Sequence, residues 1–140
     1  MTIVGRAQAE AAAVPQRIWD VLADMSTWHA WNPALEWAVC EGVLGRGGYV
    51  TVKPKRGHRQ TAYRIDLVEP PCRFALGLTF GPLAALRQTW TIEASPAGSS
   101  IACEIAIAGP LAGLLVRGMA LRAAAALPDD LARLADLAAA

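Results

Sequence analysis

The sequence is poor in residues that hold metals or cross-link a chain. It has three cysteines, Cys40, Cys72 and Cys103, and two histidines, and no CxxC pair. A zinc site needs clustered thiolates and imidazoles, so we expect no metal site, and nothing indicates another cofactor. An odd number of widely spaced cysteines fits free thiols in a reducing compartment, which predicts a cytoplasmic protein.

An excess of charge of one sign is also lacking. Thirteen basic and twelve acidic residues give a net charge of +1, so no overall field attracts nucleic acid or an anionic membrane. The longest uninterrupted apolar run, 105–116, is shorter than the roughly 18 residues of a membrane-spanning helix. The first ten residues lack the apolar core of a signal peptide. We therefore expect a soluble protein with no membrane span and no nucleic-acid partner.

The chain is instead rich in apolar residues. Hydrophobic residues make up 54% of the 140 residues and charged residues 18%, which excludes a disordered chain. This length is typical of one domain, so residues 1–140 are expected to form a single unit around one core.

Alternation of apolar and polar residues predicts a series of strands. The expected strands are 3–12, 35–40, 49–55, 60–71, 72–80, 86–93 and 100–108, joined by short turns as in an antiparallel meander. Between the first two, Pro15 suits the first turn of a helix, and Ser26 is expected to cap a second, short helix that Asn32-Pro33 ends.

The last 30 residues are rich in alanine and predict a helix. Leu111, Leu114, Gly118, Leu121 and Ala125 share one stripe, and Leu127, Leu131, Leu134 and Ala138 share another, almost opposite the first. Pro128 lies where the stripes change over and removes a backbone hydrogen bond. We expect a kinked or broken helix whose first half is buried on more than one side.

Glycine-rich and basic segments have simpler explanations than a ligand site. The run 42–48 would need a glycine at position 50 to complete GxGxxG, but that residue is Val50, and the run joins two strands. The basic run 53–59 is expected at a solvated hairpin tip, with contact to an acidic partner or a membrane surface as the alternative.

The segment 13–24, followed by Trp28 and Trp31-Asn32-Pro33, resembles the opening of the polyketide cyclase/dehydrase-like branch of the START, or SRPBCC, superfamily. The glycine-rich turn, the turn at 69–71 and the final helix fall where that family has them. The resemblance implies an α+β helix-grip fold, in which a curved seven-stranded antiparallel sheet surrounds a long C-terminal helix and two short helices join strands 1 and 2. It also implies an apolar cavity for a lipid, a polyketide or a similar small hydrophobic ligand.

Three of the five tryptophans lie within 26–37. Trp31, in its turn, is expected to anchor the short helices to the sheet, and Trp19 is expected in the core. Trp28 and Trp37 are open to two interpretations: they pack, or they line the entrance of the implied cavity.

A few amphipathic side chains lie on the face of the strands that carries more of the apolar residues. Tyr63, Gln88 and Trp90 would point inward if that face is turned toward the helix, and together with Leu114 they are the predicted ligand-binding residues besides Trp28 and Trp37. In the alternative, Tyr63 and Gln88 lie at sheet ends with their polar tips in water.

No catalytic set can be assigned from spacing. Glu104 would act as an acid or base if its face were covered, but an outward carboxylate pairing across strands with Arg87 or Arg64 is the simpler interpretation. Tyr63, Gln88 and Arg64 are the other candidates for chemistry, and His29 has no partner near it in sequence.

Three functions follow. The first is a carrier or sensor of a small hydrophobic molecule, and the second is a cyclase or dehydratase that uses one acid or base in the cavity. The third is an interaction module without a ligand. The sequence leaves open the identity of the ligand, whether catalysis occurs and the oligomeric state.

Overall fold

A computed structural model describes residues 1–57 and 59–140, so His58 of the basic run lies outside the described residues. Within those ranges, seven strands form one antiparallel sheet in the order β1-β7-β6-β5-β4-β3-β2. The strands are β1 (Thr2–Ala11), β2 (Leu35–Glu41), β3 (Tyr49–Pro54), β4 (Thr61–Glu69), β5 (Arg73–Phe80), β6 (Ala84–Ser95) and β7 (Gly98–Ala108). Neighbours from β2 to β7 follow chain order, as in the predicted meander, and β1 joins at the free edge of β7.

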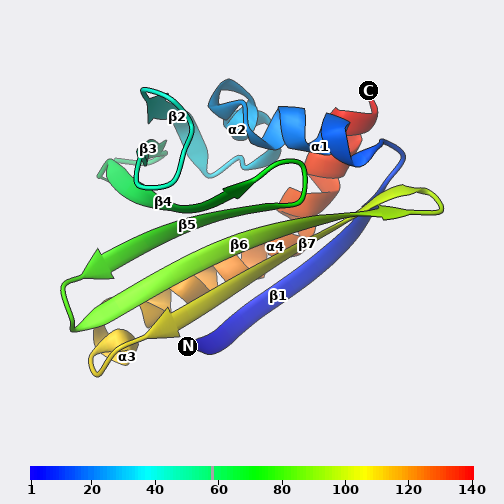
Figure 1. The fold of residues 1–140 in the computed structure, drawn as a ribbon. Coiled ribbons are helices and arrows are strands. Elements are labelled where there is room, and N and C mark those ends of the chain that lie inside the picture. Colours follow the sequence, from blue (N-terminus) through cyan, green and yellow to red (C-terminus); the bar gives the residue numbers. More distant parts are fainter. Residues whose placement is uncertain (58) are drawn as a thin grey trace.

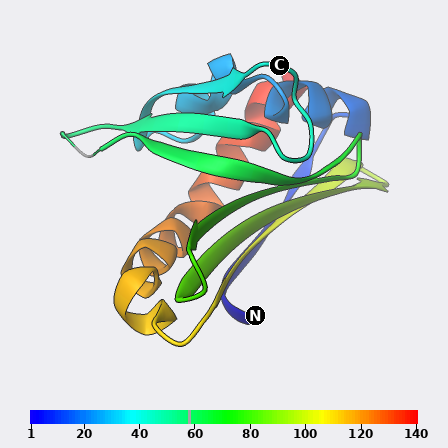
Figure 2. The same cartoon turned by 60° about the vertical axis from the view of Figure 1, so that its left-hand side comes forward.

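The short helices occupy opposite ends of this sheet, and the long C-terminal helix runs between them. The helices are α1 (Pro15–Leu22), the 3-10 helix η1 (Met25–Thr27), α2 (Trp28–Trp31), α3 (Ala112–Leu115) and α4 (Arg117–Ala139). In both views the sheet curves around α4, with α1 and α2 at the end near the C-terminus and α3 beside the β5–β6 turn near the N-terminus (Figures 1 and 2). The predicted helix-grip architecture is confirmed.

Local signals explain the start of α1 but not the cap of η1. Pro15 begins α1, where the amide that proline lacks has no intrahelical partner. The expected cap at Ser26 is wrong, because Asp24 caps instead: its Oδ1 accepts from the Ser26 amide at 3.1 Å and from the Ser26 hydroxyl at 2.6 Å. A carboxylate two residues before Ser26 therefore caps η1, and it satisfies the amide of Ser26 itself.

The inward face of β7 follows the predicted alternation. Ile101, Cys103, Ile105 and Ile107 are each at most 5% exposed, and each buried isoleucine contributes roughly 1.5–3 kcal/mol. Helix α4 packs mainly on β7 and β1. A Cβ atom at Gly5 would collide with the Cβ of Ala124, so glycine is what lets the helix lie this close to β1.

Bulges interrupt the simple alternation in β2 and β4, as one also does in β1 between Ile3 and Gly5. In β2 the register shifts between Leu35 and Trp37, so Leu35 and Ala38 are both buried while Val39 is 48% exposed. A regular strand over 35–40 would put Leu35, Trp37 and Val39 on one face, and the bulge prevents this. A second shift, between Ile65 and Leu67, does the same in β4, because an extra residue moves every later side chain to the other face.

The predicted break at Pro128 is wrong, because α4 runs unbroken past that residue. The interruption lies earlier, at Val116, between α3 and α4. One buried stripe passes through Val116, Ala120, Leu127, Leu131, Leu134 and Ala138. Small alanines continue the stripe through the first half of the helix, and Pro128 points to solvent. The first half is also not buried on several sides, since Leu114 and Leu121 are 80% and 44% exposed.

Candidate functional site

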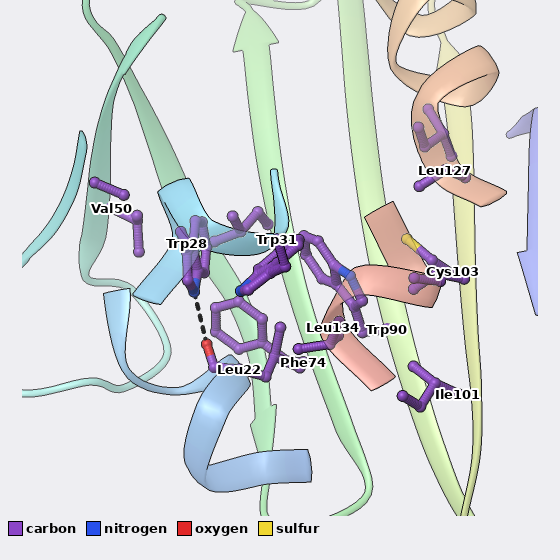
Figure 3. Close-up of a cluster of buried hydrophobic side chains, with 14 of the residues drawn as sticks. Leu22, Trp28, Trp31, Val50, Phe74, Trp90, Ile101, Cys103, Leu127 and Leu134 are labelled. Atoms are coloured by element: carbon purple, nitrogen blue, oxygen red, sulfur yellow. Dashed lines mark hydrogen bonds between the residues drawn. The ribbon is translucent and has the colours of Figure 1, made fainter. Parts of the chain in front are cut away.

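An aromatic cluster fills the inward side of the sheet beneath α1 and α2 (Figure 3). Trp28 packs on Trp31 with ring centroids 5.6 Å apart, and Phe74 of β5 lies 5.7 Å from Trp90 of β6. Trp31 meets Trp90 edge-on at 6.4 Å. Trp19, 6% exposed, reaches the cluster through Phe74. These contacts confirm Trp19 as core and Trp31 as the residue that anchors α2 to the sheet.

The three central indole groups differ in their hydrogen bonding. Trp28 Nε1 donates to the carbonyl oxygen of Leu22 at 2.9 Å, which ties α2 to the end of α1 (Figure 3). Trp31 Nε1 and Trp90 Nε1 are buried and have no acceptor among the described residues. A buried donor left without an acceptor costs about 1–3 kcal/mol, so these two N–H groups are the most unusual feature of the interior.

Beside Trp90, two neighbouring side chains on the inward face of β6 and β7 form a polar contact. Gln88 Nε2 lies 3.4 Å from the Cys103 sulfur and donates to it. Burial raises the pKa of the Cys103 thiol to about 12, so the sulfur stays neutral at physiological pH. The negative charges of Asp130 and Glu104 add to this rise.

Asp130 brings a carboxylate from α4 to this interior. The residue is 7% exposed, and its Oδ1 accepts a hydrogen bond from Arg133 at 2.9 Å. Burial raises the pKa of Asp130, and the hydrogen bond and charge of Arg133 oppose that rise. Arg133 in turn donates to the carbonyl oxygen of Trp31 at 3.2 Å, so one arginine joins the carboxylate to the aromatic cluster.

Tyr63 also faces inward. It pairs with Val50, which is fully buried, and burial raises the pKa of its phenol. Gln88 and Tyr63 are both only partly buried, whereas Trp90 is 3% exposed. The inward phase predicted for Tyr63, Gln88 and Trp90 is confirmed.

Glu104 and Arg64 lie on the outer face of the sheet. Glu104 pairs in register with Arg6 on one side and Thr89 on the other, and Cys103 beside it points inward. The outward orientation is as expected, but the expected partners are wrong: Arg64 and Arg87 both pair with Asp66, at 2.7 and 3.3 Å. A bulge beside Asp66 lets its carboxylate sit over Gly77, where a Cβ atom would collide with it.

Trp37 and Leu114 stand apart from the other predicted ligand-binding residues. The bulge in β2 places Trp37 opposite Lys53, on the face away from the buried Ala38 and Val52. Leu114 lies on α3 and is 80% exposed. The structure therefore brings together Trp28, Tyr63, Gln88 and Trp90 on the inward side and leaves Trp37 and Leu114 elsewhere.

Hollows formed by the described residues open at the surface. One, of about 390 Å³, lies between the η1 region and β2, lined by Ala23, Asp24, Met25, Ser26, Ala38, Val39, Cys40, Gly42 and Leu44. Another, of about 190 Å³, surrounds the Asp66 ion pairs. No residue of the aromatic cluster lines either hollow. The rings of the cluster pack on one another, with centroids 5.6–6.4 Å apart.

The sequence profile of one protein family matches residues 2–139, and the family is described as polyketide cyclase / dehydrase and lipid transport. The chain belongs to this family. A search of curated proteins finds no match. Among the described residues, no three His, Cys, Asp or Glu side chains are grouped as metal ligands would be, and no helix there is long and apolar enough to cross a membrane.

Solved structures share the fold of this family member. A protein from Rhodobacter sphaeroides is 20% identical over 97% of this chain and 95% of its own, with a TM-score of 0.69. Protein MLL2253 from Mesorhizobium loti is 15% identical over 94% and 93%, with a TM-score of 0.70. The di-domain ARO/CYC BexL of the BE-7585A biosynthetic pathway is 16% identical over 96% of this chain and 49% of its own, with a TM-score of 0.70.

Sequence reasoning missed Asp130 as an interior group. A break at Pro128 would put Asp129 and Asp130 at the exposed start of a new helical segment. A signal was present, because position 130 is three residues after Leu127 and four before Leu134, both on the buried stripe. The free indole donors carry no comparable signal, since hydrogen bonding of an indole depends on packing between distant segments.

Proposed function

We propose that the protein binds a small, mainly apolar molecule between the inward face of the sheet and α4, as a carrier or sensor. The family includes proteins of lipid transport and polyketide chemistry, and the interior has the composition of a ligand site. Apolar walls from β5, β6 and β7 surround a few polar groups, namely Tyr63, Gln88 and Asp130.

The observation that supports this proposal most strongly is the pair of buried indole donors without an acceptor. A ketone, ester or hydroxyl oxygen on the bound molecule would accept from Trp90 Nε1 or Trp31 Nε1 and remove the cost of leaving them unpaired. The ligand is therefore an apolar ring or chain that carries at least one acceptor oxygen.

The proposal puts the ligand beside Tyr63 and Gln88, with its oxygen toward Trp90. Those two side chains are the less covered members of the inward phase, and Gln88 precedes Trp90 by two residues on the same face. Because the aromatic cluster is packed by its own rings, binding also requires the rings of Trp31 and Trp90 to shift apart.

Two probes of nearly equal shape test this proposal. Fluorenone carries one ketone oxygen, and fluorene has the same rings without it. We expect quenching of tryptophan fluorescence by both, with fluorenone binding about 2- to 10-fold more tightly, which corresponds to one net hydrogen bond.

Matched variants locate the interaction. Trp90→Phe removes the N–H and keeps an aromatic ring, so it should abolish the preference for fluorenone. Trp37→Phe, on the outer face, should leave the preference unchanged. Absence of saturable binding of either probe would contradict the proposal and favour an interaction module without a ligand.

A second function, cyclisation or dehydration of a polyketide-like substrate, is favoured by Asp130. A buried carboxylate whose pKa is raised is suited to exchanging a proton with a bound ketone or alcohol. Glu104 and Arg64 lie outside the interior and are not candidates for this role. If turnover occurs, Asp130→Asn should abolish conversion of a linear poly-β-ketone analogue, followed by absorbance of the ring product, while fluorenone binding persists. Conversion that survives the substitution would exclude Asp130 as the acid or base.

A further inference from the structure

Large apolar side chains are exposed at the end of the molecule that carries α3. They are Phe80 at the end of β5 and Leu83 of the β5–β6 turn, 42% and 44% exposed, and Leu111, Leu114, Leu115 and Leu121 from the α3–α4 region, 39%, 80%, 37% and 44% exposed. We call these six residues the apolar end. The two segments lie side by side in both views, and the Leu111 amide donates to the Leu83 carbonyl at 2.9 Å (Figures 1 and 2).

These leucines are exposed because the backbone of α3 is held in place with their side chains pointing outward. Ala112 and Val116, on either side of Leu114, are 8% and 0% exposed and fix α3 to the core. A single helical turn held at both ends must turn Leu114 and Leu115 toward solvent. Contiguous exposed apolar groups of this kind mark interaction sites on soluble proteins.

Charge is segregated at the same end, although the whole chain is nearly neutral. The segments 78–87 and 105–122 contain Arg87, Arg117 and Arg122 and no carboxylate. Arg87 faces Asp66 on the outer side of the sheet, so it does not contribute here. Arg117 and Arg122 are exposed and form no ion pair with any described residue.

Exposed leucines beside arginines that form no ion pair within the described part of the chain match a binding partner with an apolar interior and a negatively charged surface. A second copy of this chain meeting the same patch would bring its own Arg117 and Arg122 against these, and like charges repel. An anionic phospholipid bilayer meets both demands, since leucines enter the boundary of the acyl chains while arginines remain at the headgroups.

We propose that the apolar end docks on the surface of an anionic phospholipid bilayer, with Leu114 and Leu121 at the acyl boundary and Arg117 and Arg122 on the headgroups. This is surface attachment, in keeping with the finding that no described helix can cross a membrane. The docking does not depend on the interior ligand site, so either proposal can fail alone.

Sedimentation with vesicles tests the docking. The full chain is mixed with phosphatidylcholine vesicles with and without phosphatidylglycerol, and the pelleted fraction is measured across salt concentrations. We expect pelleting with phosphatidylglycerol, little without it, and a decline as salt rises. Equal pelleting on both lipids, or none on either, would overturn the proposal.

Variants separate the apolar and charged contributions. The double substitution Leu114→Gln and Leu121→Gln should weaken binding about tenfold or more, and Arg117→Gln with Arg122→Gln about as much. Val43→Gln, at a turn residue that is 91% exposed away from this end, is the matched control and should bind as the wild type does. Unchanged binding by both double variants, or a concentration-dependent dimer that the leucine substitutions dissolve, would contradict the docking. The wild-type lipid and salt dependence decides the question even if a variant fails to fold.

Discussion

At the α1 end, the inward face of the sheet is covered by Trp19, Trp28 and Trp31, none more than 6% exposed. At the α3 end, Leu114 and Phe80 are 80% and 42% exposed. The difference follows from connection length. The segment between β1 and β2 is long enough to supply helices and aromatic rings as a cover, whereas a single turn, α3, leads from β7 into α4.

One sheet therefore carries a closed, aromatic end and an open, aliphatic and cationic end. The closed end buries its aromatic side chains and holds the free indole donors, while the open end leaves large apolar side chains exposed. A substitution in the aromatic cluster at the closed end should therefore lower the free energy of unfolding more than a substitution of an exposed side chain at the open end.

The largest expected effect is at Phe74, which touches Trp19, Trp28 and Trp90 and is 1% exposed. Phe74→Ala should lower the free energy of unfolding by about 3–5 kcal/mol, because it leaves a cavity in the cluster. Urea denaturation measures the loss. Phe80→Ala, at the same phase of the same strand, should cost less than about 1 kcal/mol, and equal losses would erase the distinction between the ends.

A smaller effect is expected where α4 crosses β1. Gly5→Ala should destabilise the protein by about 1–3 kcal/mol, because the new methyl group meets the Cβ of Ala124. Adding Ala124→Gly removes the opposing methyl group and should restore part of the loss in thermal unfolding. If Gly5→Ala did not lower the stability, α4 would have to lie farther from the sheet. The exposed side chains at the α3 end would then reflect a loosely held helix.

A pH-dependent difference is expected from Asp130. Burial raises its folded-state pKa above the unfolded value, so the folded protein binds more protons between those two values. Its contribution to stability therefore falls as pH rises through that window and stays constant above it. Asp130→Asn should flatten this part of the curve in urea denaturation at several pH values, whereas Asp136→Asn, at an exposed acid on the same helix, should not. An unchanged curve in Asp130→Asn would place that carboxylate in water.

The smallest effect is expected at Leu114. Leu114→Gln should change the free energy of unfolding by no more than about 0.5 kcal/mol, because the side chain has little packing to lose. Differential scanning fluorimetry is sufficient to measure it. A loss comparable to that of Phe74→Ala would mean that α3 packs into the core and does not present a free surface.

Most of the fold could be predicted from the sequence, because alternation in β5, β6 and β7 and the proline at the start of α1 are local signals. The inward phase of Gln88 and Trp90 followed from the same alternation. Trp37 could not be placed, because a bulge that shifts the register leaves no mark in composition. Ala120 and Ala124 were overlooked since alanine fits either face, and without them Pro128 looked like a break in the helix.

The most direct test of the interior site follows the indole N–H resonances of nitrogen-15-labelled protein during titration with fluorenone. The account predicts that the Trp90 signal, and that of Trp31 if the rings part together, moves downfield as the N–H gains an acceptor. The signal of Trp37, on the outer face, should stay in place, and that of Trp28, already bonded to Leu22, should show no downfield shift from a new acceptor. If saturating fluorenone leaves Trp31 and Trp90 unmoved, or shifts only Trp37, no ligand reaches the interior and the proposed site does not exist.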